Sequence, residues 1–217
     1  MAGTPQPLLM KPAGPAGTIH VSNLLTYGAL VSGCGAVYFA IIAHHRAAAG
    51  AFMAIAVIAD TFDGLFARLF DRTGFQSAFG VQLDSLTDAV TSGFVPVIVL
   101  ASDSTPATLA AALAWWSCAF LYTFAAITRL GYYNLTHDNG PWFIGLPAPC
   151  CALVVSTSLL WSPHVLAAAI VLVCCAVAMV LPIRLPRPRT LGLAAFVGWA
   201  LLIVVLHALF SNSSNTP

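Results

Sequence analysis

The chain carries D-T-F-D-G-L-F-A-R at residues 60–68 and, eleven residues later, G-V-Q-L-D-S-L-T-D at residues 80–88. Both stretches lie in or at the edge of long apolar runs, over about 47–70 and 82–101. An ionised aspartate at the centre of a bilayer costs roughly 2.5–3.5 kcal/mol on insertion scales. Four aspartates in such surroundings therefore indicate a functional site within a membrane protein rather than a set of helix caps.

The spacing of the four aspartates predicts that their carboxylates converge. Asp60 and Asp63 are three residues apart and Asp84 and Asp88 are four apart, so each pair lies on one face of its helix. Asp60 lies ten residues before the end of its apolar run, and Asp88 lies about six after the start of the next. At ~1.5 Å per residue, both are expected ~10–15 Å below the cytoplasmic helix ends. A short loop joins the two helices, so all four carboxylates should meet at one depth.

Charge balance inside this site points to metal ions. Arg68 alone cannot neutralise four carboxylates, whereas two divalent cations can. Ligands that are all carboxylates suit Mg²⁺, Mn²⁺ or Ca²⁺ better than Zn²⁺. Two such ions beside an arginine form a clamp for a diphosphate, and Gly64 and Ala67 leave the helix face beside it small and open. A proton or cation transporter that uses the same carboxylates is one alternative, and a membrane scaffold without catalytic activity is another.

The composition excludes an ordinary water-soluble domain. Of the 217 residues, 59% are hydrophobic and 7% are charged, whereas a soluble domain has about a quarter of its residues charged. A net charge of +1 provides no basic surface for nucleic acid. Because a spanning helix needs about 20 apolar residues, we expect an all-α, polytopic transmembrane helical bundle. Its candidate helices are the apolar runs over about 23–43, 47–70, 82–101, 107–133, 146–162, 165–182 and 190–210.

Basic residues indicate how the chain lies in the membrane. We expect a flexible tail over 1–19, a membrane domain over 20–183, and a basic loop, C-terminal helix and short tail over 184–217. Cytoplasmic loops carry an excess of Lys and Arg. With the N-terminus in the cytoplasm, only Arg46 of the eight basic residues falls on the outer side, and the carboxylate site opens toward the cytoplasm. The residues on the cytoplasmic side are Lys11, Arg68, Arg72, Arg129, Arg184, Arg187 and Arg189.

These motifs resemble the signature of the CDP-alcohol phosphatidyltransferase family. The family pattern D-x-x-D-G-x-x-A-R, a spacer and G-x-x-x-D-x-x-x-D matches at eight positions between Asp60 and Asp88. The spacer is longer than is usual in the family, and we expect the additional residues to lie in the cytoplasmic loop. Three further segments resemble the members that make phosphatidylserine, namely N-L-L-T at 23–26, R-L-G-Y-Y-N at 129–134 and F-I-G-L-P-A-P at 143–149.

The resemblance implies a transferase with two metal ions. Mg²⁺ or Mn²⁺ ions held by the four aspartates would bind the diphosphate of CDP-diacylglycerol, and Asp88 would also act as the general base. The implied metal ligands are Asp60, Asp63, Asp84 and Asp88, and the implied contacts to the CDP-lipid are Gly64, Ala67, Arg68 and Gly80. A six-helix core with a seventh helix, and a homodimer, are implied as well.

The same resemblance favours L-serine as the acceptor alcohol. The serine hydroxyl would attack the β-phosphorus, CMP would leave and phosphatidylserine would form. Arg129 closes a predicted helix beside the G-L-P segment, where it could hold the serine carboxylate, and Asn134 is the second candidate contact. Glycerol phosphate, inositol phosphate or another alcohol stays open as the acceptor.

Overall fold

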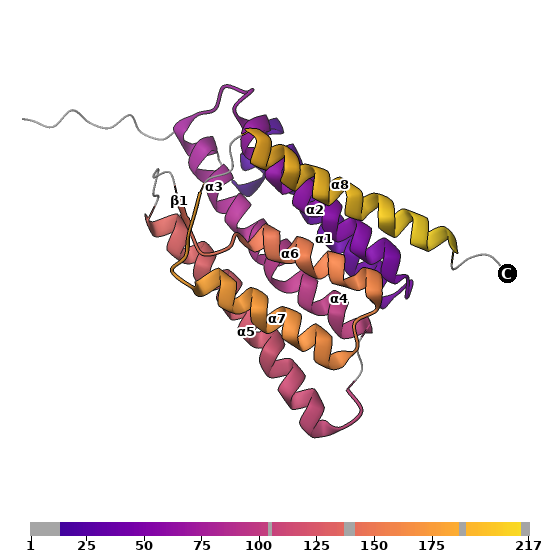
Figure 1. Ribbon diagram of the computed structural model, residues 1–217. Coiled ribbons are helices and arrows are strands. Elements are labelled where there is room, and N and C mark those ends of the chain that lie inside the picture. Colours follow the sequence, from indigo (N-terminus) through magenta and orange to yellow (C-terminus); the bar gives the residue numbers. More distant parts are fainter. Residues whose placement is uncertain (1–13, 104–105, 137–141, 187–189, 214–217) are drawn as a thin grey trace, which may run out of the picture.

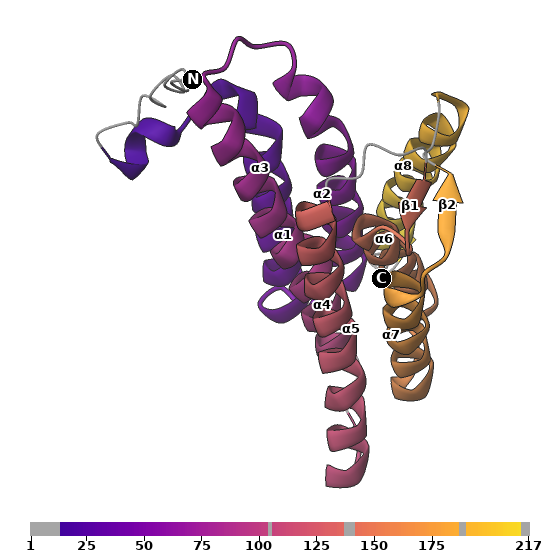
Figure 2. The ribbon, with the colours of Figure 1, turned by 90° about the vertical axis from the view of Figure 1, so that its left-hand side faces the viewer.

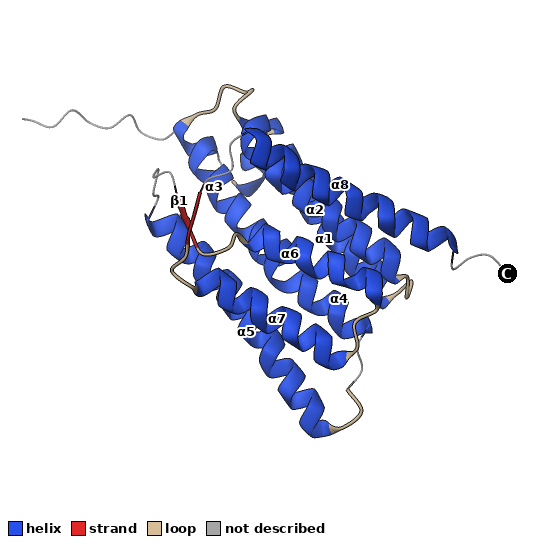
Figure 3. Cartoon of the chain, in the orientation of Figure 1, coloured by secondary structure: helices blue, strands red, loops and turns tan. Residues whose placement is uncertain are grey.

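The computed structural model describes residues 14–103, 106–136, 142–186 and 190–213. The described residues form a bundle of helices that run roughly side by side, with two very short strands, β1 (Trp142–Ile144) and β2 (Arg184–Pro186), toward one end (Figures 1 and 3). The prediction of an all-α membrane bundle is thereby confirmed. Residues 1–13 of the predicted N-terminal tail and 214–217 of the predicted C-terminal tail lie outside the described residues.

The helices follow the predicted apolar runs in order. Two 3₁₀ turns, Pro15–Thr18 and Val21–Asn23, lead into the bundle. A π-helical turn, Ala89–Phe94, joins α3 to α4 in one continuous rod, and a 3₁₀ turn, Leu159–Trp161, ends α6. The α-helices are α1 (Leu24–Ile41), α2 (Arg46–Ala67), α3 (Gly74–Asp88), α4 (Val95–Asp103), α5 (Leu109–Thr136), α6 (Ala148–Ser158), α7 (Val165–Val180) and α8 (Thr190–Ser213).

Five of these helical segments are long and apolar enough to cross a membrane. Two shorter apolar helices, Ala148–Trp161 and Val165–Val180, complete the bundle. The chain is therefore a multi-pass membrane protein, and its C-terminal helix has the length of a spanning segment. The five long segments are Val21–Ile41, Arg46–Ala67, Gly74–Asp103, Leu109–Thr136 and Thr190–Ser211.

The third predicted helix begins earlier than its apolar run. Thr73 and Gln76 form a capping box, in which the Thr73 hydroxyl accepts from the Gln76 backbone N–H at 3.2 Å and the Gln76 side chain accepts from the Thr73 N–H at 2.9 Å. This polar start signal lies outside the apolar run, and it lets α3 begin at Gly74. The spacer between the two acidic stretches is consequently shared between a short loop over 69–73 and the first turns of α3.

The predicted depths of the aspartates change with these boundaries. Asp60 lies seven residues before the end of α2, or ~10 Å, while Asp88 is the last residue of α3, ~21 Å from its start. The two helices therefore do not end level with each other. The first turns of α3 extend beyond the last turn of α2. The two acidic stretches, 60–68 and 80–88, still meet side by side.

A two-stranded antiparallel pair, which the sequence analysis did not predict, lies toward the same end as the α2–α3 loop (Figure 2). Strand β1 (Trp142–Ile144) pairs with β2 (Arg184–Pro186). The pairing connects the segment before α6 to the segment before α8. Gly145 follows β1 with a φ of +72°, a conformation that favours glycine, and its N–H donates to the Ile183 carbonyl at 2.9 Å. A Cβ there would run into the Met179 backbone, so this turn requires glycine.

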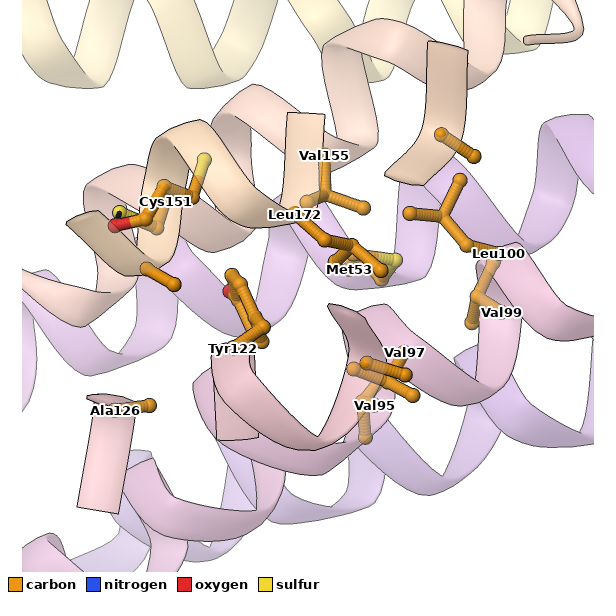
Figure 4. Packing of buried hydrophobic residues seen from close by; sticks show 14 of the residues in the cluster. Met53, Val95, Val97, Val99, Leu100, Tyr122, Ala126, Cys151, Val155 and Leu172 are labelled. Carbon is orange, nitrogen blue, oxygen red and sulfur yellow. Dashed lines mark hydrogen bonds between the residues drawn. The ribbon is translucent and has the colours of Figure 1, made fainter. Parts of the chain in front are cut away.

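The buried core lies between α1, α2, α4, α5, α6 and α7, and Figure 4 shows it around Met53, Leu100, Tyr122 and Leu172. Helix α8 lies beside α2 at the edge of the bundle (Figure 1). A second apolar cluster there contains Ala54, Val57, Ala200 and Ile203. Alanines alternate with larger aliphatic residues in this cluster, and the alanines allow the helices to pack closely.

Candidate active site

Three carboxylates from two helices form the centre of the site. Asp60 on α2 and Asp84 and Asp88 on α3 each offer an oxygen, and these oxygens lie within 4.8 Å of one another. The spacing of four residues places Asp84 and Asp88 one turn apart on the face of α3 that meets α2. Asp88 is 9% exposed, and Asp60 and Asp84 are half-buried. These three groups could hold a metal ion.

Asp63, the fourth aspartate, has a different partner. Its Oδ2 accepts a hydrogen bond of 2.8 Å from the Thr26 hydroxyl on α1, and the carboxylate is buried. It also lies within electrostatic range of Asp84, so it lies next to the cluster of Asp60, Asp84 and Asp88. The sequence analysis did not include Thr26 in the site, although the N-L-L-T segment ends on it.

Two charged groups at the centre each leave a buried side-chain atom without a partner. Oδ1 of Asp88 and Nε of Arg129 have no hydrogen-bond partner among the described residues. The two side chains lie within electrostatic range of each other. A buried carboxylate oxygen without a donor is costly unless a cation or a proton satisfies it. Together with a ligand set made only of carboxylates, this fits a hard divalent cation such as Mg²⁺ or Mn²⁺.

A cavity of about 210 Å³ lies beside the carboxylates. All four residues that the resemblance assigns to the CDP-lipid line it, namely Gly64, Ala67, Arg68 and Gly80. Asp63 and Asp84 form part of its wall. The lining residues that sequence reasoning missed are Ser22, Asn23, Thr26, Arg72 and Val81. Asn23 and Thr26 could have been found from the sequence, because both belong to the N-L-L-T segment that resembles the family.

The two glycines of this cavity differ in what surrounds them. A Cβ on Gly80 would lie 3.1 Å from Asn23 Oδ1, so Gly80 allows α3 to approach the start of α1. A Cβ on Gly64 would meet nothing within 4 Å. The space beside Gly64 is therefore open to a ligand.

The candidate acceptor residues lie on α5. Arg129 has its guanidinium 6.0 Å from the centre of the Tyr133 ring, and it lines a second cavity of about 260 Å³ beside Ile144 and Met179. Asn134 donates a hydrogen bond of 2.8 Å to the Ser85 hydroxyl, next to Asp84 on α3. Both α5 residues thus reach toward the helix that carries Asp84 and Asp88.

The fold and the site define a multi-pass helical membrane protein with a carboxylate centre inside the bundle and a cavity beside it. The family model for CDP-alcohol phosphatidyltransferases matches residues 19–182. The chain belongs to the CDP-alcohol phosphatidyltransferase family.

Several curated proteins are similar to the chain. It is 33% identical over 155 residues to the CDP-diacylglycerol–serine O-phosphatidyltransferase of Mycobacterium tuberculosis. This match covers 67% of this chain and 51% of that protein. The Bacillus subtilis enzyme of the same name is 28% identical over 149 residues, covering 68% and 80%. The archaetidylserine synthase of Methanothermobacter thermautotrophicus is 30% identical over 141 residues, covering 64% and 58%. The chain thus spans about half the length of the mycobacterial relative.

Proposed function

We propose that this protein transfers a phosphatidyl group from CDP-diacylglycerol to the hydroxyl of L-serine, giving phosphatidylserine and CMP. The observation that carries the proposal is the cluster of Asp60, Asp84 and Asp88 beside a cavity lined by the signature residues. The names of the similar bacterial proteins support serine as the acceptor.

Each part of the site has a task in this reaction. The serine hydroxyl attacks the β-phosphorus of the CDP-lipid, its proton passes to Asp88, and the bond between the β-phosphorus and CMP breaks. Asp60, Asp63, Asp84 and Asp88 would hold two divalent cations, Mg²⁺ or Mn²⁺, which would supply electrostatic stabilisation of the diphosphate. The buried, unpartnered Oδ1 of Asp88 suits a group that accepts a proton.

The cavity lining suits the nucleotide part of the lipid substrate. Arg68 provides a cation for phosphate, and Gly64, Ala67 and Gly80 provide room for a flat base close to the helices. Arg129 is the candidate partner of the serine carboxylate, because its Nε is buried without a partner beside Asp88. Asn134 supports the same side of the site through Ser85.

We propose that the site opens toward the cytoplasm, on the same side as the N-terminus. Arg68 and Arg72 lie at the end of α2 and in the loop after it, and Arg46 lies at the start of α2, where it pairs with Asp103 at 3.3 Å. Excess positive charge on the cytoplasmic side explains this distribution. Lys11, Arg187 and Arg189, which the orientation argument also used, lie outside the described residues. We also propose that two copies of this protein form a homodimer.

The test is a panel of acceptors with purified protein in nanodiscs. CMP release from CDP-diacylglycerol is followed with Mg²⁺ or Mn²⁺ and with serine, glycerol phosphate or inositol phosphate. Serine-dependent CMP release that a chelator abolishes is the expected result. Release with another alcohol but not with serine would replace the acceptor and retain the reaction class. Cation flux in liposomes without any CMP release would replace the transferase by a transporter.

A further inference from the structure

The helix that carries Asp84 and Asp88 changes its winding directly after Asp88. Residues Ala89–Phe94 form a π-helical turn, and the N–H of Val95 donates to the carbonyl of Val90, five residues earlier. An α-helix bonds to the carbonyl four residues earlier. The wider turn alters how the residues before it are rotated relative to α4, which is anchored in the core.

Pro96 leaves one carbonyl of this turn without its usual donor. In an α-helix the N–H of residue 96 would donate to the carbonyl of Ser92, but proline has no N–H. Ser92 is 2% exposed, so water does not readily replace that donor. A buried carbonyl that stays unpaired is costly, so a further donor to the Ser92 carbonyl from another helix stabilises this turn.

Helix α5 supplies that partner. The Tyr122 hydroxyl donates to the Ser92 carbonyl at 2.9 Å, and the Thr123 hydroxyl donates to the Gly93 carbonyl at 3.2 Å. Tyr122 is fully buried, in the middle of the apolar cluster (Figure 4). Helix α5 packs directly on this turn, since a Cβ on Gly93 would make van der Waals contact at 3.7 Å with the Cβ of Ala126. Two neighbouring hydroxyls thus clamp two neighbouring carbonyls.

We propose that Tyr122 and Thr123 are positioning residues, which hold the π turn and thereby the rotation of α3 that aims Asp84 and Asp88 at Asp60. The inference rests on the proposed function for its link to catalysis. Neither hydroxyl touches the reacting groups in this scheme. Their effect passes through the backbone of Ala89–Phe94, which begins one residue after Asp88.

The experiment compares Tyr122→Phe and Thr123→Val with wild type in phosphatidylcholine nanodiscs. Mn²⁺ binding is measured by the loss of the free-ion signal in electron paramagnetic resonance, and CMP release gives kcat and KM. Since supporting groups around a metal site commonly change affinity by 10–100-fold, we expect about tenfold weaker Mn²⁺ binding for Tyr122→Phe. A displaced base should also lower kcat about tenfold with KM for CDP-diacylglycerol little changed.

Ser156→Ala is the matched control. Its hydroxyl also donates from one helix to a buried backbone carbonyl of another, that of Gly50 at 2.8 Å, but away from the carboxylates. We expect this variant to lose stability without a change in Mn²⁺ affinity. Equal effects of Ser156→Ala and Tyr122→Phe on Mn²⁺ affinity would overturn the positioning role, as would wild-type Mn²⁺ affinity in Tyr122→Phe.

Pro96→Ala tests the origin of the clamp. It restores an N–H at position 96, which an α-helical turn would direct at the Ser92 carbonyl, so Tyr122→Phe should weaken Mn²⁺ binding by less in the Pro96→Ala background. An equal loss in both backgrounds would overturn the link between the proline and the tyrosine. A wild-type chain that binds Mn²⁺ but releases no CMP would overturn only the proposed reaction, whereas one that binds no Mn²⁺ would overturn the metal centre and this inference together.

Discussion

The hydroxyl of Thr26 on α1 donates to the carboxylate of Asp63 on α2 at 2.8 Å. This bond joins the first helix of the bundle to the acidic stretch of the second, at the wall of the cavity beside the carboxylate cluster. Asp63 also lies within electrostatic range of Asp84, next to the cluster of Asp60, Asp84 and Asp88. A side chain on a separate helix thus contacts one of the four aspartates directly.

The Thr26–Asp63 bond is tested by Thr26→Val, which keeps the shape of the side chain and removes the donor. Asp63 is 8% exposed, so the loss leaves a buried carboxylate oxygen unpaired, and we expect about 1–3 kcal/mol of destabilisation. The KM for CDP-diacylglycerol should rise as well, because Asp63 lines the cavity. Thermal unfolding and CMP-release kinetics measure the two effects. Thr26→Ser keeps the hydroxyl and should behave like wild type.

The role of Asp88 as the base is tested by Asp88→Asn. An amide cannot take the proton of the acceptor, so kcat should fall by roughly 10²–10⁴-fold. Binding of CDP-diacylglycerol, followed as a shift in the unfolding temperature, should largely remain. Asp103→Asn is the control, because Asp103 pairs with Arg46 at the opposite end of α2 from the carboxylate cluster, and such partly exposed pairs contribute little to stability. Wild-type kcat in Asp88→Asn would remove Asp88 from the role of base.

Gly64→Ala separates ligand space from protein packing. No atom of the protein lies within 4 Å of the added Cβ, and alanine favours a helix over glycine by up to about 1 kcal/mol. We therefore expect unchanged or raised stability together with a higher KM for CDP-diacylglycerol. Gly198→Ala on α8 also has open space, and it should show the gain in stability without the rise in KM. A Gly64→Ala enzyme with wild-type KM would place the nucleotide elsewhere.

The docking of α8 depends on Gly50 of α2. A Cβ on Gly50 would overlap the ring of His207, which is buried and bonds through Nε2 to the Ser156 carbonyl at 3.0 Å. We expect Gly50→Ala to destabilise the protein by about 1–3 kcal/mol, as overpacking commonly does. Thermal unfolding in detergent measures this effect. Adding His207→Ala removes the overlapping ring, so Gly50→Ala should cost less in that background; additive losses would contradict the contact.

Much of the fold could be read from hydropathy alone. The apolar runs predicted the long helices and their order, because burial in lipid requires continuous apolar segments. The predicted start of the third helix, at about residue 82, was wrong. The structure begins this helix at Gly74, because the capping box of Thr73 and Gln76 is a polar signal outside the apolar run. The β1–β2 pair could not be predicted, since its register joins Trp142–Ile144 to a segment some forty residues further along.

By itself, the sequence determined that this is a helical membrane protein and that Asp84 and Asp88 share a helix face, because hydropathy and helical period act within one segment. Only the tertiary structure decided that Asp60 lies beside Asp84 and Asp88 and that Asp63 accepts a hydrogen bond from Thr26. The same holds for the clamp of Tyr122 on Ser92. These contacts depend on the rotation and offset of whole helices, which are set by packing between residues far apart in the chain.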